Sequence, residues 1–477
     1  PVTVIRVNEQ GKLTLDSEAL RSVLLQEDVR DLPVVVLLVA GAFRSGKSSI
    51  LNVLLRFPYL RFRNWLGDPY KPLEGFPWMP GADAHTEGIV FWSHLFRATT
   101  ADMKEVAVLL VDTQGSFGTS SSMATSVHIC ALSVLISSIQ VFNVIRNLQL
   151  AHLQHLQTCY EYGEQVQGLE GAASGFQRCV LLVRDWPWPK QHEFGWEGGD
   201  QLLQKILGVE SKNKATDELR ARRTYFESCL SSLKCFLMPS PGHTNYVCCL
   251  NGAVHGITPS FNEYLRDFVW GVLSPSELVV KTVAEVPVTA SELCRFVEKI
   301  TPMFSSEKLP VPGIMVGKTA EFFAELAREK ALKEYRYSLR QVLQSNGILI
   351  SPEELKQKEV NIREKVLDSF DNAPCLKLYE FNKKKRESFI KELDTSFSDV
   401  RAEVLDASKK HRKKPNLKED LTVIFKVVAQ AGSVCARTIP AIPTAVNYAA
   451  NAGNAVARGL AEFVALSTGE VTANIKQ

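Results

Sequence analysis

Eight consecutive residues have the composition and spacing of a phosphate-binding loop. They read Gly41-Ala-Phe-Arg-Ser-Gly-Lys-Ser48 and match the pattern G-x-x-x-x-G-K-[ST]. The apolar run at residues 34–40 predicts a strand before them, and residues 49–56 suit a helix behind them, which is the context such a loop requires. The glycines let backbone N–H groups approach phosphate oxygens at a helix N-terminus. Because Lys47 can neutralise phosphate charge and Ser48 can offer a hydroxyl to Mg²⁺, the sequence predicts a nucleoside triphosphate site.

A carboxylate for the same metal ion is expected at the end of the next central strand. The apolar run at residues 106–111 ends in Asp112-Thr-Gln-Gly115, where Asp112 would meet Mg²⁺ and the Gly115 backbone would meet the γ-phosphate. Between the two motifs, a switch loop needs a threonine that reaches the metal and the attacking water. Thr86, in Ala84-His-Thr-Glu-Gly88, is the candidate. Spacing alone does not distinguish Thr86 from an ordinary loop threonine.

Recognition of guanine requires an acidic side chain that accepts from two base N–H groups. The usual Asn-Lys-x-Asp pattern is absent, and Asn213-Lys-Ala-Thr-Asp217 places its aspartate one residue late. Asp185 follows Arg184 and the apolar run at residues 179–183, which is the right place for such an acid. On the residues alone, Asp185 could equally be a capping or salt-bridged carboxylate at a strand end.

The elements that must position these residues follow an α/β pattern. From residue 32 to about residue 273, short apolar runs alternate with longer periodic stretches, which is typical of βαβ units and a mostly parallel sheet. The runs at 34–40, 106–111 and 179–183 predict central strands covered by helices on both faces. Residues 126–160 hold apolar residues at helical spacing without Pro or Gly, so we expect one long buried helix there.

A helical region is predicted beyond the α/β pattern. Pro, Gly and Ser interrupt residues 273–276 and 301–313, which indicates a linker. Three charged stretches with apolar residues at helical intervals follow, at 318–343, 352–370 and 379–407, and a three-helix bundle is their simplest packing. Ser351-Pro-Glu-Glu354 has the features of a helix start.

Composition excludes some functions. Among 477 residues, 55 Lys and Arg face 52 Asp and Glu, a balance of +3 that provides no overall basic field for nucleic acid. The ten cysteines form no Cys-x-x-Cys pair, so we expect no zinc knuckle. Several lie in apolar runs where a reduced thiol packs well, which favours a reducing, cytosolic compartment. The chain starts with Pro1 and shows no leader, so we expect a trimmed N-terminus.

The last residues could contact a membrane. Residues 409–414 are a basic run, and an Ala- and Val-rich tail follows. Residues 438–457 are uncharged but contain two prolines and three asparagines, which makes a spanning helix a poor interpretation. Residues 421–436 could lie in the interface beside anionic headgroups. Solvated helix ends and a small-residue packing helix are the alternative.

Five segments together resemble the atlastins, which belong with the guanylate-binding proteins to the dynamin superfamily of GTPases. They are Val39–Ser48, Val108–Gly115, Ser137–Asn143, Leu182–Trp186 and Cys235–Pro239. The resemblance implies that Arg184 and Asp185 read guanine and that Arg44 is an internal arginine finger. It implies catalytic roles for Arg44 and Thr86, and metal binding by Ser48, Thr86 and Asp112. The implied phosphate-binding residues are Arg44, Ser45, Gly46, Lys47, Ser48, Ser49, Gln114 and Gly115. The loop at residues 242–245 corresponds to the guanine cap, but its residues diverge.

The resemblance also implies an organisation. We expect an α/β P-loop GTPase (G) domain at 1–275, a linker and first helix at 276–313, an all-α three-helix-bundle middle domain at 314–412 and the basic, Ala- and Val-rich tail at 413–477. The last part departs from the atlastins, which carry two strongly apolar spans there.

The expected function is hydrolysis of GTP to GDP and phosphate, coupled to G-domain homodimerisation and middle-domain movement. It would occur in the cytosol or on the cytoplasmic face of an intracellular membrane, with the tail as the membrane contact. In the alternative, a GTP-switched dimer regulates a ubiquitin ligase or scaffold upstream of Pro1, because the resemblance is strongest to atlastin-like GTPases that carry a RING finger.

Overall fold

A central sheet of nine strands organises the first part of the chain. The computed structural model describes residues 1–8, 11–42, 45–77, 86–115, 123–167, 176–207, 216–242, 256–283, 286–305, 312–345, 352–372 and 383–412. The strands of the sheet are β1 (Val2–Val7), β2 (Leu13–Leu15), β3 (Val34–Gly41), β4 (Ile89–Phe91), β5 (Phe96–Thr99), β6 (Glu105–Thr113), β7 (Ile139–Ile145), β8 (Phe176–Arg184) and β9 (Leu230–Leu237). A separate hairpin pairs β10 (Thr282–Val283) with β11 (Val286–Pro287).

The strand order explains why the predicted motifs meet. The order is β2-β1-β4-β6-β3-β7-β8-β9, with β5 paired to β6. Strands β6, β3, β7, β8 and β9 run parallel, whereas β1, β2, β4 and β5 add antiparallel pairs. The carboxyl ends of β3 and β6 are therefore neighbours, and ligands of open α/β sheets bind at this edge.

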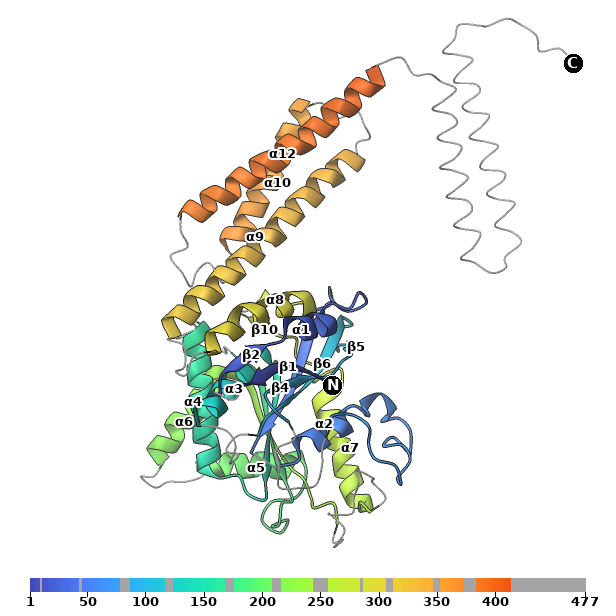
Figure 1. Ribbon diagram of the computed structural model, residues 1–477, viewed down its shortest axis with the longest axis vertical. Helices are drawn as coiled ribbons and strands as arrows, with labels where there is room; N and C mark the ends of the chain where they lie inside the picture. Colours follow the sequence, from blue (N-terminus) through green and yellow to red (C-terminus); the bar gives the residue numbers. More distant parts are fainter. Residues whose placement is uncertain are drawn as a thin grey trace, which may run out of the picture. The chain divides into compact units, whose positions relative to one another are not determined.

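Helices cover both faces of the sheet (Figure 1). They are α1 (Ser17–Leu24), α2 (Lys47–Leu54), α3 (Met123–Ile136), α4 (Leu150–Gln167), α5 (Trp196–Ile206), α6 (Thr216–Cys229), α7 (Pro259–Leu273) and α8 (Ala290–Ile300), with short 3-10 turns at Phe57–Tyr59 and Thr301–Phe304. Alternate residues of β3 point to opposite faces: Val36 packs in the core that contains α3 and α4, and Leu37 in the core that contains α2 and α7. All of β3 is buried, as predicted for a central strand.

The prediction of a single helix over residues 126–160 is wrong. The structure has α3, then β7, then α4 in that stretch. Ser137 and Ser138 separate α3 from β7, and the Ser138 hydroxyl accepts from Val36 N at 2.9 Å. Because the run is apolar almost throughout, its periodicity did not separate a buried helix from a buried strand. The three predicted central strands are confirmed.

In the helical region, a long helix overlaps each of the three stretches that were predicted to be helical. The helices are α9 (Pro312–Ser345), α10 (Pro352–Asp371) and α12 (Lys383–Arg412) (Figure 1). Two compact units divide the chain: Pro1–Leu339 with Glu359–Ser396, and Arg340–Lys358 with Phe397–Gln477. Within the first, the buried Tyr335 hydroxyl donates to the Glu359 carboxylate. In the second, Leu355 is buried against apolar neighbours. The domain boundaries at residues 275, 313 and 412 stay predictions.

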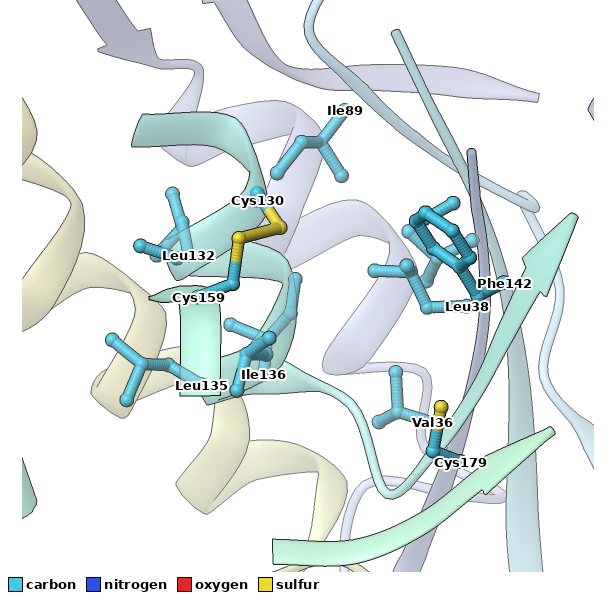
Figure 2. Packing of buried hydrophobic residues seen from close by; sticks show 14 of the residues in the cluster. Val36, Leu38, Ile89, Cys130, Leu132, Leu135, Ile136, Phe142, Cys159 and Cys179 are labelled. Carbon is cyan, nitrogen blue, oxygen red and sulfur yellow. A yellow bond between two sulfur atoms is a disulfide. The ribbon is translucent and has the colours of Figure 1, made fainter. Parts of the chain in front are cut away.

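The cysteines differ in part from expectation. Cys179, Cys229, Cys235 and Cys294 are buried thiols, as predicted for cysteines in apolar runs. Cys130 and Cys159, by contrast, are joined in a disulfide, which the expectation of reduced thiols did not include (Figure 2).

Within the described ranges, no helix combines the length and apolar character that crossing a membrane requires. The tail at residues 413–477, for which membrane contact was predicted, lies outside those ranges.

Candidate functional site

The phosphate loop joins β3 to α2 at the carboxyl edge of the sheet. Gly46 caps α2 with φ +79°, a left-handed conformation that favours glycine. Gly41 ends β3 where a Cβ would lie 2.2 Å from the Asn143 carbonyl oxygen, so only glycine allows this approach to β7. Ser45, a residue of the loop itself, is buried, and Ser49 lies in the first turn of α2. Arg44, the predicted arginine finger, lies outside the described residues.

Three predicted metal ligands converge on one point. The Asp112 carboxylate at the end of β6 accepts from the Ser48 hydroxyl at 2.5 Å and from the Thr86 hydroxyl at 3.1 Å, both on Oδ2. The two hydroxyl oxygens are 3.4 Å apart. Oδ1 accepts from Thr113 N at 2.9 Å, which fixes the orientation of the carboxylate. The structure thus brings together residues that are separated by 38 and 26 positions.

The electrostatics of this cluster suit a cation. Asp112 is almost fully buried, and burial raises the pKa of its carboxyl, while the Ser48 hydroxyl and the Lys47 charge oppose that rise. Burial lowers the pKa of the Lys47 ammonium, and Asp112 opposes that shift. Lys47 Nζ donates to the Ala42 carbonyl at 3.2 Å within the loop. A buried carboxylate and a buried ammonium are therefore held a short distance apart, next to the start of a helix.

The donor set fits Mg²⁺. One carboxylate and two hydroxyl groups are hard oxygen ligands, and Mg²⁺ binds through one or two carboxylates together with phosphates and water. A cavity of about 310 Å³ adjoins the cluster, with Thr86 and Asp112 in its wall. The residues present can thus hold this ion.

Gln114 and Gly115 follow Asp112 at the same edge. Gln114 is bonded to the backbone of Gly88 in both directions: Gly88 N donates to Gln114 Oε1 at 3.0 Å, and Gln114 N donates to Gly88 O at 2.8 Å. Gly115 is buried. The segment after β6 is therefore tied to the start of β4, the strand that follows Thr86.

Arg184 makes contacts that the motif did not predict. Its Nη1 donates to the carbonyl oxygens of Ser45 at 3.1 Å and Gly46 at 3.2 Å, so this side chain holds the backbone of the phosphate loop. Burial lowers the pKa of the guanidinium, and the neighbouring Asp185 opposes the shift. Asp185 is partly buried and has φ +54°, a left-handed conformation that directs the chain sharply at the end of β8. Residues 243–255, which include most of the predicted guanine cap, lie outside the described ranges.

Asn143 is a site residue to which the sequence analysis assigned no role. It lies fully buried in β7, and its Nδ2 donates to Ser45 O at 2.7 Å. The same nitrogen lies 3.3 Å from Ser45 Oγ. Ser45 thus receives hydrogen bonds from two neighbouring strands, β7 and β8. A polar residue inside an otherwise apolar run was the available signal.

Comparisons with known proteins identify relatives of this chain. The model of the family "Guanylate-binding protein, N-terminal domain" matches residues 10–282. Atlastin-2 of Xenopus laevis is 36% identical over 402 residues, which cover 83% of this chain and 70% of that protein. Human atlastin-3 is 36% identical over 406 residues, 83% of this chain and 74% of that protein. The atlastin of Drosophila melanogaster is 34% identical over 409 residues, 84% and 75% respectively. The chain belongs to the atlastin and guanylate-binding-protein family.

It is therefore a GTPase of the dynamin superfamily, and the predicted fold class is confirmed. In this atlastin-type GTPase, the phosphate loop, Asp112 and Thr86 lie at the carboxyl edge of the sheet. Other P-loop proteins bind nucleotide at the same edge. The individual roles of these side chains remain predictions, as do those of Arg44 and Asp185.

Proposed function

We propose that the chain hydrolyses GTP to GDP and phosphate in a Mg²⁺-dependent reaction. The observation that carries the proposal is the convergence of Ser48 and Thr86 on the buried Asp112 carboxylate, next to Lys47. These groups come from α2, the loop before β4 and the end of β6. Binding of a metal ion and of the phosphates attached to it is a role that accounts for all three.

Each group has a proposed task. Ser48 and Thr86 would hold Mg²⁺, with Asp112 as the carboxylate that orients its shell. Bound there, Mg²⁺ supplies positive charge to the β- and γ-phosphate oxygens. Lys47, already buried at the start of α2, neutralises the same oxygens, and the backbone N–H groups from Ser45 to Ser49 form the cradle. Arg44 would supply positive charge that stabilises the negative charge on the phosphate oxygens. That negative charge develops only as the bond to the γ-phosphate breaks.

Base choice would come from the end of β8. Asp185 lies where a carboxylate can accept from the two N–H groups that guanine has and adenine lacks. Arg184 supports the proposal indirectly. Its hydrogen bonds to Ser45 and Gly46 would keep the end of β8, where Asp185 lies, at a fixed position relative to the phosphate loop.

Beyond hydrolysis, we propose that GTP drives homodimerisation through the G domain and movement of the middle domain at an intracellular membrane. The support is membership of the family and the long helices α9, α10 and α12 that follow α8. The tail at 413–477 would contact the membrane, with the protein on its cytoplasmic face or in the cytosol. No nucleic-acid partner is proposed. The alternative, regulation of a ubiquitin ligase or scaffold upstream of Pro1, differs in not requiring the tail.

Turnover of GTP and ATP as a function of protein concentration tests the central proposal. GTP hydrolysis whose rate per molecule rises with concentration is expected, and a flat profile would count against catalysis in a dimer. Arg44→Ala should abolish most GTP turnover, by about three orders of magnitude or more, with nucleotide affinity retained. Arg30→Ala, at an exposed arginine, is the matched control. Normal hydrolysis by Arg44→Ala would show that the finger is assigned wrongly.

Flotation with liposomes, with and without residues 421–477, separates the two accounts of the membrane. Loss of flotation on truncation supports the tail as the anchor. Equal flotation, or none in either form, removes the anchor and favours the scaffold alternative.

A further inference from the structure

Two cysteines outside the phosphate loop face each other across two helices. Cys130 lies in α3 and Cys159 in α4, and the disulfide between them joins the two helices (Figure 2). Their Cα atoms are 6.1 Å apart, inside the range that disulfides adopt without backbone movement. Cys130 is 5% exposed and Cys159 1% exposed, so the bond lies within the core formed by α3, α4 and the sheet.

A histidine lies beside one of the two sulfurs. His155 precedes Cys159 by one turn of α4, and its Nε2 lies 3.9 Å from Cys159 Sγ. Burial, and then the neighbouring His152, lower the pKa of the His155 imidazole, so it is neutral at physiological pH. A neutral imidazole can accept a thiol proton. Since His155 is only partly buried, it also lies on the side from which a small molecule can arrive.

The chemistry of the compartment decides what this pair does. Cytosolic glutathione keeps thiols reduced, and cytosolic disulfides are usually transient and either catalytic or redox-sensing. This step rests on the cytosolic exposure proposed above, whereas the reactivity of the pair does not. Two thiols that are already placed at bonding distance lose little freedom when the bond forms.

We propose that Cys130 and Cys159 form a reversible oxidation site that reacts with a hydroperoxide and, once oxidised, fastens α3 to α4. Cys159 is the attacking thiol, because its sulfur lies within 3.9 Å of His155 Nε2, one turn earlier in the same helix. Cys130 is the resolving thiol.

The reaction balances with one hydroperoxide. The Cys159 thiol gives its proton to His155 Nε2 while its sulfur attacks the terminal peroxide oxygen. The O–O bond breaks, and the leaving alkoxide takes the proton from His155 as an alcohol, or as water when the oxidant is hydrogen peroxide. Cys159 is now a sulfenic acid. The Cys130 sulfur attacks the Cys159 sulfur, the S–O bond breaks, and hydroxide leaves with the Cys130 proton as water. Two thiolates of a reductant such as glutathione reverse the bond by exchange.

The location gives the oxidised state a consequence. Helix α3 is the element that follows the Asp112–Gly115 segment of the phosphate site, and α4 follows β7, which carries Asn143. A covalent bond between α3 and α4 restricts any relative shift of two helices that both connect to that edge of the sheet.

A metal site is the main rival. The Cys130 and Cys159 sulfurs and a His155 nitrogen lie within 4.8 Å of one another, the only such group in the part of the chain that the structure describes. Structural zinc sites use four protein ligands, and the described residues supply three here. In the disulfide, moreover, neither sulfur is a thiolate that could bind zinc.

The test uses the purified full chain, reduced and then treated with hydrogen peroxide. Peptide mapping should find the Cys130–Cys159 linkage, and glutathione should reverse it. In Cys130→Ser, dimedone should trap a sulfenic acid on Cys159, whereas in Cys159→Ser trapping on Cys130 should be at least about ten-fold slower. His155→Gln should slow oxidation of the pair about 100-fold, the low end of what a general base typically contributes. Cys294→Ser, at a buried free thiol, is the control and should oxidise like wild type.

Four results would overturn the proposal. They are no linkage after peroxide treatment, a linkage that glutathione cannot reduce, equal trapping on both cysteines, and one equivalent of zinc in the reduced chain that blocks oxidation. Because oxidation is read by mass, the result does not depend on GTP turnover, and a failure of the GTPase proposal is recognised separately. If a serine variant is poorly folded, the rate of linkage in wild type and in His155→Gln still decides between these outcomes.

Discussion

The arginines at the two ends of strand β8 allow a matched test of how the phosphate loop is held. At the carboxyl end, Arg184 donates to the carbonyls of Ser45 and Gly46. Near the other end, buried Arg178 donates to the carbonyls of Gly271 and Glu277, at 3.0 Å each, and also forms an ion pair with the Glu277 carboxylate. Both arginines donate to two backbone oxygens, but only Arg184 contacts the phosphate loop. We therefore expect Arg184→Met and Arg178→Met to separate binding from stability.

The size of the binding effect follows from the bonds that are lost. A hydrogen bond with a charged donor contributes about 1.5–3 kcal/mol, so removing two costs about 3 kcal/mol at the low end. If that cost falls on the loop conformation that binds phosphate, the dissociation constant for GTP rises roughly 100-fold, since about 1.4 kcal/mol corresponds to a factor of ten. Arg178→Met should leave the dissociation constant for GTP within about two-fold of the wild-type value. It should lower the free energy of unfolding by about 3 kcal/mol, the cost of two hydrogen bonds with a charged donor.

Titration with a fluorescent GTP analogue gives the affinity, and urea unfolding gives the stability. Wild-type GTP affinity in Arg184→Met would refute the reasoning, because the loop would then hold its shape without the guanidinium. Equal loss of affinity in both variants would also refute it, since β8 would then be acting only through general stability.

Three further predictions concern other parts of the chain. Burial lowers the pKa of Lys281 to about 7 from 10.5, so between those values the unfolded chain binds more protons and the free energy of unfolding should rise with pH, by up to about 1.4 kcal/mol per unit. Lys281→Met should remove that slope in urea unfolding from pH 7 to 9. Oxidation of Cys130 and Cys159, which are 29 positions apart, should add about 3.6 kcal/mol by loop closure and raise the thermal midpoint, with no such rise in a serine variant. Tyr335→Phe should cost about 1–3 kcal/mol in urea unfolding because the buried Glu359 carboxylate loses a donor, whereas substitution of the exposed Tyr337 by Phe should cost less than 0.5 kcal/mol.

Much of the fold could be predicted because its strands are short, apolar and separated by clear breaks. Strands β3, β6 and β8 were predicted within a few residues on that basis. The stretch from α3 to α4 could not be divided correctly. Apolar residues lie on both sides of Ser137 and Ser138, and these two serines alone do not mark a break. A buried strand and a buried helix can both be apolar throughout, so periodicity does not distinguish them. Tertiary pairing of β7 with β3 and β8 decided the outcome.

The site was predictable where backbone position alone determines the chemistry. Ser48 and Asp112 follow strands that are neighbours in the sheet, so their meeting follows from the order of the strands. The support of Ser45 by Asn143 and Arg184 could not be predicted in the same way. Those contacts depend on the direction of a side chain at a strand end, and no sequence spacing encodes that direction.

The two ends of the sheet discourage self-association in different ways. At one end lies β2, with only three residues, and at the other β9, whose Ser231, Ser232 and Lys234 are at least partly exposed. Short or polar edge strands discourage pairing between molecules. Strand β1, which pairs with β2, also pairs with the outer edge of β4, which reads Ile89-Val-Phe91. A shortened chain that lacks the first sixteen residues would present this apolar strand as a new edge, so the N-terminal hairpin acts as a guard against aggregation.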